Sequence, residues 1–319
     1  MLILLWGLSG ESPLTAVHAE LNRLGISTVL LDQRDILDTE IDLCVGKQIQ
    51  GTIRSGNQTI DLSAVTAVYL RPYASRCLPQ IAKAGVMSPA WRHAIAFDEA
   101  LLSWLEMTPA LVVNRPAAMA PNNSKPYQLL QIRELGFNVP ETLITTDPGA
   151  VQAFWERHGS VIYKSVSGIR SQVSRLGSEH LGRLANVSWC PTQFQHYIPG
   201  TDYRVHVVDT EVFACEVISD ADDYRYAAQY AAPAELRSCY LPSDIEARCR
   251  ILAKALHLPV AGIDLRCTPS GEWYCFEVNP APGFTYYQQA TGQPISKAIA
   301  QLLVRGTCAQ LTPCLSLVN

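Results

Sequence analysis

Apolar residues in the first third of the chain alternate between short continuous runs and runs with helical spacing. Residues 2–5 form a continuous apolar run, which predicts a buried strand. A helix is then expected to begin at Ser12-Pro13 and to end at Gly25, because serine caps helices and proline fits their first turn. Its apolar positions recur at helical spacing: Leu14, Val17, Leu21 and Leu24. The next strand is predicted over residues 27–31, and this β-α-β order favours a parallel sheet.

The second half of the chain has a different pattern, in which strands predominate. A helix predicted over residues 243–257 interrupts them, and Ser243 and Glu246 have the spacing of a capping box at its start. A last helix is predicted around residues 295–305. The predicted strands are residues 191–198, 202–208, 211–218, 260–267 and 272–279. Together, the two halves predict an α/β (α+β) protein.

Proline residues mark a boundary between the two patterns. Residues 114–121 contain two prolines, which is typical of a segment between domains. Beyond it, Leu129 and Ile132 lie on the apolar face of a helix that Gly136 stops. Neither an internal repeat nor a low-complexity tract is visible. We therefore expect three domains, residues 1–113, 114–189 and 190–319.

Composition and charge exclude several classes of protein. The chain has 319 residues, of which 48% are hydrophobic and 17% charged, an ordinary globular profile. Its net charge of -4 argues against a nucleic-acid partner, which would need a basic face. The longest apolar runs fall short of the ~20 residues that span a membrane, and the first residues lack the positive region of a signal peptide. We expect a cytoplasmic protein.

The chain contains ten cysteines. They form no C-x-x-C pair and no cluster with the spacing of a zinc site. Several, such as Cys275, fall within apolar runs, where cysteine behaves as a small buried hydrophobic residue. We therefore expect reduced, structural cysteines throughout. The positions are 44, 77, 190, 215, 239, 249, 267, 275, 308 and 314.

The clearest local pattern is a predicted hairpin in the last quarter of the chain. Its strands, residues 261–267 and 272–279, are separated by a turn-forming Thr-Pro-Ser-Gly quartet. If the quartet forms the whole loop, Asp264 lies opposite Cys275 and diagonally from Glu277, about 7–8 Å away between backbones. Residues two apart in a strand share a face. The polar face would then hold Asp264, Arg266, Glu277 and Asn279.

This polar face has two interpretations. Carboxylate and amide oxygens at Asp264, Glu277 and Asn279 are the ligands that nucleotide-bound Mg²⁺ requires. Alternatively, the face is simply solvated, because the opposite side of the hairpin is apolar and polar residues would point outward in any case. The hairpin by itself does not decide between them.

Two lysines precede the hairpin in positions suited to phosphate binding. Lys125 stands at the predicted start of a capped helix, where phosphate is drawn to the helix N-terminus. Lys164 lies in a predicted strand, residues 161–165, just before a loop of small residues that includes Gly168 and Ser171. Backbone N–H groups of such a loop can fold over phosphates. Each lysine alone has the alternative of being a surface charge.

The order of these motifs resembles the ATP-grasp superfamily. The segments that carry the likeness are NNSK, GFNVPETLIT, VIYKSVSG, FQHYIPGTDYR, AGIDLR and FEVNPAPG, which together span roughly residues 115–305. Ribosomal-protein glutamate ligases and microviridin-type peptide ligases are the branches that the chain resembles most. The resemblance implies an ATP-grasp fold preceded by a β-α-β domain, with residues 114–189 as its small subdomain and 190–319 as its large one.

The resemblance also implies roles for individual residues in nucleotide binding. Lys125 and Lys164 match phosphate-binding lysines, and Asp202 matches a ribose ligand. Residues 195–198 match the hinge that holds adenine, but His196 stands where the family usually has an acid. The implied nucleotide-binding set is Lys125, Lys164, Gly168, Ser171, Gln195, His196, Tyr197, Ile198 and Asp202.

The metal ligands and catalytic arginines follow from the same likeness. Asp264, Glu277 and Asn279 match the metal ligands, with Glu277 as the bridge between two Mg²⁺ ions; Mn²⁺ is the alternative ion. Arg204 and, more loosely, Arg225 match arginines that contact phosphate or the tetrahedral centre. Arg266 is a third arginine on the metal-bearing face. A surface ion pair is the alternative role for each arginine.

The implied activity is ATP- and Mg²⁺-dependent ligation of a carboxylate to an amine or another nucleophile through an acyl phosphate. A kinase-like phosphotransferase and a non-catalytic nucleotide-binding scaffold are the alternatives. The substrate is expected to be a peptide, an amino acid or a small carboxylic acid, and Arg71 is a weak candidate for contacting it. No membrane partner is expected, and a homo-oligomer is left open.

Overall fold

The computed structural model describes residues 2–166, 173–219 and 234–306. Within them the chain divides into two compact units. The first comprises the described residues up to Ala117 and from Pro294 onward, and the second is Ala118–Gln293. Gly168, Ser171 and Arg225, which the sequence predicts as site residues, lie outside the described residues.

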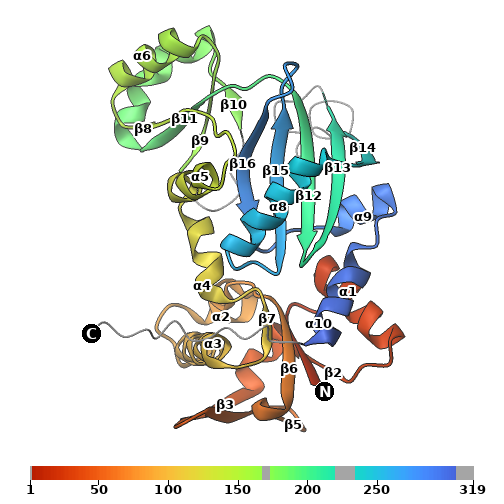
Figure 1. The fold of residues 1–319 in the computed structure, drawn as a ribbon. Coiled ribbons are helices and arrows are strands. Elements are labelled where there is room, and N and C mark those ends of the chain that lie inside the picture. The colour runs from red at the N-terminus through yellow and green to blue at the C-terminus, as the bar shows by residue number, and fades with distance from the viewer. Residues whose placement is uncertain (1, 167–172, 220–233, 307–319) are drawn as a thin grey trace, which may run out of the picture. The chain divides into compact units, whose positions relative to one another are not determined.

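The first unit is built on a parallel sheet with the strand order β2-β1-β6-β7. The expected β-α-β arrangement is present, because α1 connects β1 to its neighbour β2 (Figure 1). The sheet strands are β1 (Leu2–Gly7), β2 (Thr28–Asp32), β6 (Val65–Arg71) and β7 (Leu111–Val113). The helices are α1 (Ser12–Arg23), α2 (Pro79–Ala84), α3 (Pro89–Met107), α10 (Ile295–Arg305) and short 3-10 turns at Gln33–Asp38, Leu62–Ala64 and Ser75–Cys77.

A separate antiparallel sheet in this unit joins β3 (Thr39–Val45), β4 (Ile49–Ser55) and β5 (Gln58–Asp61). The last helix, α10, packs against α1 and β6 and so belongs to the first unit. The sequence analysis assigned these residues to the last domain. A short helix, α4 (Pro116–Met119), and a 3-10 turn at Ala120–Asn123 lead into the second unit.

The second unit contains two sheets. The smaller is antiparallel with the order β10-β9-β11-β8, and α6 and a long 3-10 segment, η5, pack with it. Its core joins Phe154 of α6 to Val161 and Phe194 of the sheet. Its elements are β8 (Thr142–Thr145), α6 (Pro148–His158), β9 (Val161–Ser165), β10 (Ser174–Arg175), η5 (Ser178–Trp189) and β11 (Thr192–His196).

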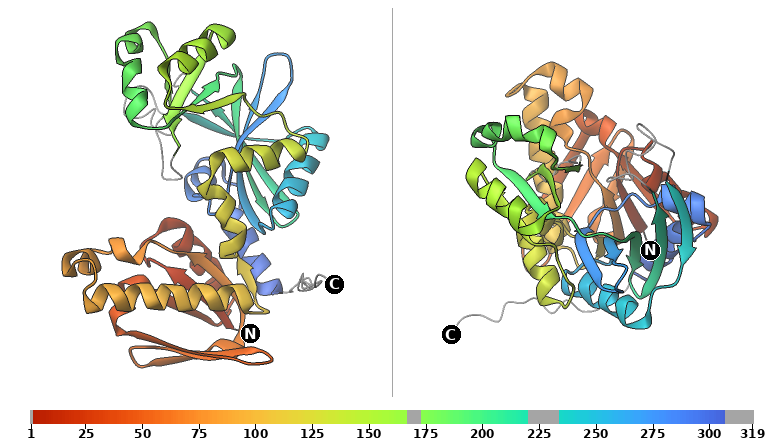
Figure 2. Two further views of the ribbon diagram at one scale, coloured as in Figure 1. Left: turned by 90° about the vertical axis from the view of Figure 1, so that its left-hand side faces the viewer. Right: turned by 90° about the horizontal axis from the view of Figure 1, so that it is seen from above.

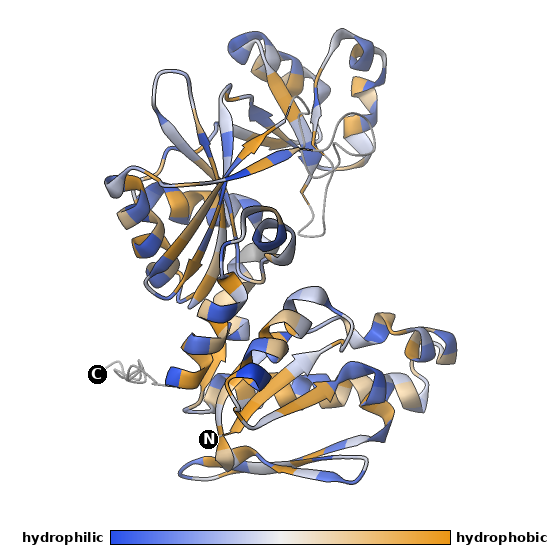
Figure 3. Cartoon of the chain, turned by 90° about the vertical axis from the view of Figure 1, so that its right-hand side faces the viewer, coloured by the Kyte–Doolittle hydropathy of each residue, from blue (hydrophilic) through white to orange (hydrophobic). Residues whose placement is uncertain are grey.

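The larger sheet is antiparallel with the order β14-β13-β12-β15-β16. Helix α8, cyan in Figure 2, lies along one face and packs with the apolar residues Val205, Ile263 and Leu265. The central strands of the parallel sheet in the first unit are largely orange in Figure 3, as expected for buried strands. The elements are α5 (Lys125–Glu134), β12 (Thr201–Val208), β13 (Glu211–Ile218), β14 (Glu235–Cys239), α8 (Ser243–Ala255), β15 (Val260–Cys267), β16 (Trp273–Asn279) and α9 (Thr285–Thr291).

Three helix starts differ from the expected ones. Glu11, not Ser12, caps α1, and its carboxylate accepts a hydrogen bond from the Leu14 N–H at 2.8 Å. Ser124 precedes α5 without a side-chain cap. The predicted capping box of α8 is absent, because Pro242 occupies the cap position and Glu246 pairs with Arg250 instead. Of these three helices, only α1 has a side-chain cap, and a charged residue supplies it.

Two further expectations concern cysteines and membranes. The eight cysteines within the described residues are all free. Cys308 and Cys314 lie outside that part of the chain. None of the helices in the described residues is long and apolar enough to cross a membrane.

Candidate active site

Charged residues form a row across three neighbouring strands of the larger sheet. In register, Arg204 on β12 lies opposite Asp264 on β15, and Asp264 lies opposite Glu277 on β16. Asn279 lies two residues beyond Glu277 on β16, opposite Gly262. Residues directly opposite one another point to the same side of a sheet. The row therefore occupies the face opposite to the one that α8 covers.

The hairpin that carries this row contains a β-bulge. Leu265 pairs with Cys275 and Asp264 with Glu277, so Phe276 is an extra residue on β16. The turn is also one residue longer than the quartet, because Cys267 pairs with Trp273 and Glu272 belongs to the turn. The expected pairing of Asp264 with Cys275 is wrong for both reasons, and Cys275 lies fully buried on the apolar face. Together, the longer turn and the bulge move Glu277 from a diagonal position to one directly opposite Asp264. The expectation that the two carboxylates share a face is met, at closer range than predicted.

Arg204 is buried and fixed by Asp264. Its Nη1 donates to Oδ1 of Asp264 at 2.6 Å. Gly262 makes room for the guanidinium, since a Cβ atom at that position would collide with Nη2 of Arg204. The guanidinium also lies 5.7 Å from the ring centre of Tyr287, within cation–π range. Arg204 therefore holds its charge rigidly beside the two carboxylates.

His206 lies next along β12 on the same face as Arg204 and is completely buried. Burial, reinforced by the charge of Arg204, holds the pKa of His206 well below its ordinary value. The ring is therefore neutral, and it packs 5.2 Å from the ring of Tyr287. The positive charge in this part of the face belongs to Arg204.

Arg266 contacts Ile198, which precedes β12, and Asp202, the second residue of β12. Its Nε and Nη2 bind both oxygens of Asp202 at 2.7 and 2.8 Å, and its Nη1 donates to the carbonyl of Ile198 at 2.7 Å. It also lies over the rings of Tyr197 and Phe276, at 5.5 and 5.3 Å. Arg266 thus anchors the predicted hinge to β15. Asp202, the predicted ribose ligand, accepts two of these three hydrogen bonds.

Buried amides without partners lie on one face of the smaller sheet. Gln193 is opposite Lys164 in register, and Gln195 lies two residues further on the same face. Gln193 is 0% exposed, and neither of its amide atoms has a hydrogen-bond partner within the described residues. The Oε1 of Gln195 is likewise buried and unpartnered there. Such atoms are costly, at about 1–3 kcal/mol each, unless a ligand supplies the missing bond.

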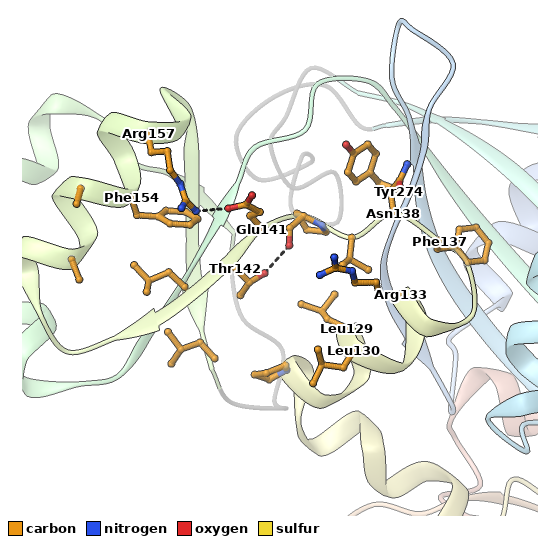
Figure 4. Close-up of a pocket in the computed structure, with 17 residues that line it drawn as sticks. Leu129, Leu130, Arg133, Phe137, Asn138, Glu141, Thr142, Phe154, Arg157 and Tyr274 are labelled. Atoms are coloured by element: carbon orange, nitrogen blue, oxygen red, sulfur yellow. Dashed lines mark hydrogen bonds and ion pairs between the residues drawn. The ribbon is translucent and has the colours of Figure 1, made fainter.

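The orientation of the Gln195 amide is set by Thr142. The Thr142 hydroxyl donates its only proton to the Pro140 carbonyl at 3.0 Å, the bond drawn in Figure 4. It can therefore only accept from Gln195, whose Nε2 lies 2.9 Å away. Oε1 of Gln195 is thereby left as an acceptor on the face that carries Lys164.

His196 does not share that face. Its ring stacks on His158 of α6 with 4.7 Å between ring centres, on the side where Phe194 packs. Burial, and then His158, lowers the pKa of His196. The His196 side chain therefore packs against α6 and lies on the face opposite to that of Lys164. The backbone N–H of His196 donates to the Glu141 carbonyl and that of Tyr197 to the Ser160 carbonyl, both at 2.9 Å.

Lys125 is the first residue of α5, and this helix is bonded directly to β16. Nε2 of Gln128 donates to the Val278 carbonyl at 2.6 Å, and the Val278 N–H donates to Oε1 of Gln128 at 3.0 Å. Val278 stands between Glu277 and Asn279. The structure thus ties the helix of the first predicted lysine to the strand of the predicted metal ligands.

The candidate metal ligands fit a hard, oxygen-binding ion. Within the described residues no three His, Cys, Asp or Glu side chains are grouped so that they could hold a metal. The candidate set has only two carboxylates, those of Asp264 and Glu277, and its third member is the side-chain amide of Asn279. Two carboxylates and an amide oxygen suit Mg²⁺, which keeps several waters and binds through one or two carboxylates together with substrate phosphates.

Two other features of the described chain are an ion pair in the first unit and a cavity in the second. In the first unit Arg71, at the end of β6, binds Glu11 with 2.6 Å between Nη2 and Oε1. In the second unit a cavity of about 980 Å³ is lined by α5, α6, the segment 137–144 and Tyr274 (Figure 4). Arg157, on its wall, pairs with Glu141. The candidate site residues do not line this cavity.

Sequence reasoning missed Gln128, Thr142 and Gln193. Gln128 had a signal: it stands four residues before Ile132 and so occupies the apolar stripe of its helix. A glutamine in such a position must find a buried partner. Gln193 and Thr142 carried no comparable signal.

Several solved structures are similar to this chain over nearly its whole length. The macrocyclase MdnC from Microcystis aeruginosa, bound with the precursor peptide MdnA, has a TM-score of 0.78 and 26% identity, covering 96% of this chain and 100% of its own. The ATP-grasp ligase PsnB, complexed with a precursor variant, Mg and ADP, has a TM-score of 0.79 and 26% identity, covering 95% and 98%. D-alanyl-alanine synthetase A from Vibrio cholerae shares only the fold, at a TM-score of 0.60 and 14% identity.

Curated relatives match a shorter stretch, and no family model matches the chain. Glutathione synthetase from Salmonella typhimurium is 32% identical over 123 residues, which are 35% of this chain and 37% of the relative. The chain therefore spans little more than a third of the curated relatives it matches. The chain has the fold of the ATP-grasp ligases and is similar to several of them, which confirms the predicted fold and class of enzyme. Within that class it is similar to peptide macrocyclases and to glutathione synthetase.

Proposed function

We propose that this chain uses ATP and Mg²⁺ to activate a carboxylate as an acyl phosphate and joins it to an amine. The observation that carries this proposal is the in-register row of Arg204, Asp264 and Glu277, whose charges lie on one rigid face. Such a face can hold charge that develops on a phosphoryl group without reorganising. The likeness to PsnB, which was solved with Mg and ADP, supports the same cofactors.

The nucleotide would lie on the face of the smaller sheet that carries Lys164. The unpartnered amides of Gln193 and Gln195 support this placement, because a bound base offers the hydrogen bonds they lack. Oε1 of Gln195, oriented by Thr142, would accept from the adenine amino group. The Ile198 N–H, which has no partner within the described residues, would contribute the backbone contact expected of the hinge. His196 and Tyr197 would contribute only through the hydrogen bonds that their N–H groups donate to the carbonyls of Glu141 and Ser160.

Asp264, Glu277 and Asn279 would hold the metal, with Glu277 bridging two Mg²⁺ ions and Mn²⁺ as the alternative. When bound, the ions neutralise charge on the phosphoryl group that is transferred. Lys125 and Lys164 would bind the phosphates, and the loop with Gly168 and Ser171 would cover them. Asp202, held by Arg266, is proposed for the ribose.

In the proposed reaction a carboxylate oxygen of the substrate attacks the γ-phosphorus of ATP, and ADP leaves. The amine nitrogen then attacks the carbonyl carbon, loses a proton, and phosphate departs with the electrons of the C–O bond. Arg204, fixed by Asp264, would stabilise the oxyanion of this second step, with Arg225 as a further candidate. Arg266 would position the hinge rather than act on the substrate.

We propose a peptide as the substrate that carries the carboxylate. The relatives MdnC and PsnB were solved with precursor peptides, and they match the whole chain, whereas glutathione synthetase matches about a third of it. A free amino acid or small carboxylic acid is the alternative. The division into 1–113, 114–189 and 190–319 and a homo-oligomeric state remain predictions.

The test combines ADP release with product mass. Purified protein is incubated with ATP, Mg²⁺ and a panel of acidic peptides, amino acids and amines. A product lighter by one water than its two reactants, formed with one ADP each, supports the ligase. A phosphorylated product would instead mean a kinase, and nucleotide binding without any ADP release would mean a scaffold.

A further inference from the structure

Gln128 covers the edge of the strand that bears the proposed metal ligands. It is 3% exposed, and its amide makes two reciprocal bonds with the backbone of Val278, at 2.6 and 3.0 Å. β16 is an edge strand, and these bonds replace part of the missing neighbour. Farther along the same edge, the Cys275 N–H donates to the Asn138 carbonyl at 2.9 Å.

The two ends of this connection carry different parts of the proposed site. Lys125 precedes Gln128 by three residues, so the two lie on the same side of α5. Val278 separates Glu277 from Asn279 and directs its own side chain into the core. A shift of Gln128 relative to Val278 would therefore move the lysine relative to both proposed ligands.

We propose that Gln128 is a positioning residue that couples phosphate binding at Lys125 to metal binding on β16. This inference rests on the proposed function and adds a residue to it. With the amide in place, one nucleotide can be held from both sides at the same time. Without it, α5 and β16 each remain folded, but their spacing is no longer fixed by a direct bond.

A merely structural role is the alternative, and the chain offers a matched control for it. Gln33, in the first unit, is 1% exposed and bonds both ways with the backbone of Tyr73, at 2.8 Å to the carbonyl and 2.7 Å from the N–H. Replacing either glutamine by methionine removes such a reciprocal pair of bonds and nearly conserves volume; at Gln33 it also removes a third bond, from Nε2 to Oγ of Ser75 at 3.1 Å. Only Gln128 is connected to proposed ligands.

The experiment measures how much Mg²⁺ strengthens ADP binding. The dissociation constant of ADP is determined by calorimetry with and without Mg²⁺ for the wild type, Gln128→Met and Gln33→Met, and their ratio is the coupling. We expect Gln128→Met to reduce this ratio about tenfold, the lower end of what supporting residues of metal sites contribute. Gln33→Met should leave it unchanged, although both variants lose stability.

The outcomes separate this inference from the proposed function. If Mg²⁺ does not strengthen ADP binding to the wild type, the proposed function itself fails. If it does, and Gln128→Met retains the full ratio or Gln33→Met loses as much, the positioning role of Gln128 is overturned. Should Gln128→Met not fold, Gln128→Asn serves instead, since it keeps an amide but is one methylene too short to make both bonds.

Discussion

The two sheets of the second unit differ in the kind of polar group that they bury. On the larger sheet Arg204 is paired with Asp264 and Arg266 with Asp202, so the charges are neutralised within the protein. The neutral ring of His206 on that sheet has no hydrogen-bond partner for either nitrogen among the described residues. On the smaller sheet Gln193 and one atom of Gln195 are likewise buried without partners there. The larger sheet thus pairs its charges, and the smaller sheet leaves amides unpaired.

This difference suits two tasks. Charges that must act on a reacting group are best fixed beforehand, because reorganisation then costs nothing during the reaction. A site for a neutral base gains from unpaired groups, because the free energy lost by burying them, about 1–3 kcal/mol each, is recovered only when the ligand binds. Paired charges would thus favour catalysis, and unpaired amides would favour selective binding.

Glu277→Gln should have the largest effect. It conserves size but removes the charge that faces Asp264, and we expect ADP formation to fall about a hundredfold or more. Glu272→Gln, on the exposed turn of the same hairpin, is the control and should retain full activity. Rates of ADP release are compared after circular dichroism has verified the fold. Near-normal ADP release by Glu277→Gln would remove the metal assignment.

Arg204→Met tests whether the pairing on the larger sheet stabilises the fold as well. The substitution removes a buried charge-assisted bond and leaves Asp264 without this partner. We expect it to reduce the free energy of unfolding by about 2 kcal/mol. Urea titrations of both proteins give the difference. An unchanged free energy of unfolding would mean that Asp264 is fully solvated. The pairing of charges on the larger sheet would then no longer distinguish it from the smaller sheet.

Thr142→Val addresses the smaller sheet. Without the hydroxyl, the Gln195 amide can turn over and present its NH₂ group instead of its oxygen. We expect the preference for ATP over GTP to fall about tenfold, because the selectivity then loses the contribution of one hydrogen bond. Binding constants for both nucleotides are measured for this variant and for His196→Ala, whose preference should match that of the wild type. A loss confined to His196→Ala would restore the original hinge assignment.

The ATP-grasp fold was predicted from the resemblance of the motifs to that superfamily, and the shared face of Asp264 and Glu277 from strand alternation, which leaves a strong pattern. It could not reveal the bulge at Phe276, since Cys275 is small and apolar enough to fit either face. The orientation of the hinge side chains could have been predicted from the sequence. Phe194 is the apolar residue of β11, and alternation from it places His196 on the core face and Gln195 on the other. The ion pair of Glu11 with Arg71, which lies 60 residues further along the chain, leaves no local pattern.

The smallest expected effect concerns two histidines, one on each sheet. The pKa values of His206 and His196 are both lowered in the folded protein, chiefly by burial. An unfolded histidine, with a pKa near 6.5, therefore binds more protons than the folded one just below that pH. Stability from each neutral ring is complete above about pH 6.5 and is lost as the pH falls. His206 should dominate, because it is completely buried, whereas His196 is partly solvated.

Urea titrations at pH 5.5 and 7.5 measure this contribution as a difference between the two pH values. We expect His206→Phe to reduce the acid destabilisation of the wild type clearly, and His196→Phe to reduce it only slightly. Comparing the pH difference within each variant cancels any change in packing that the new ring causes. If the two variants behave alike, the surroundings of the two histidines are equally polar. The larger sheet would then not be the drier of the two, and its paired charges would be screened by solvent.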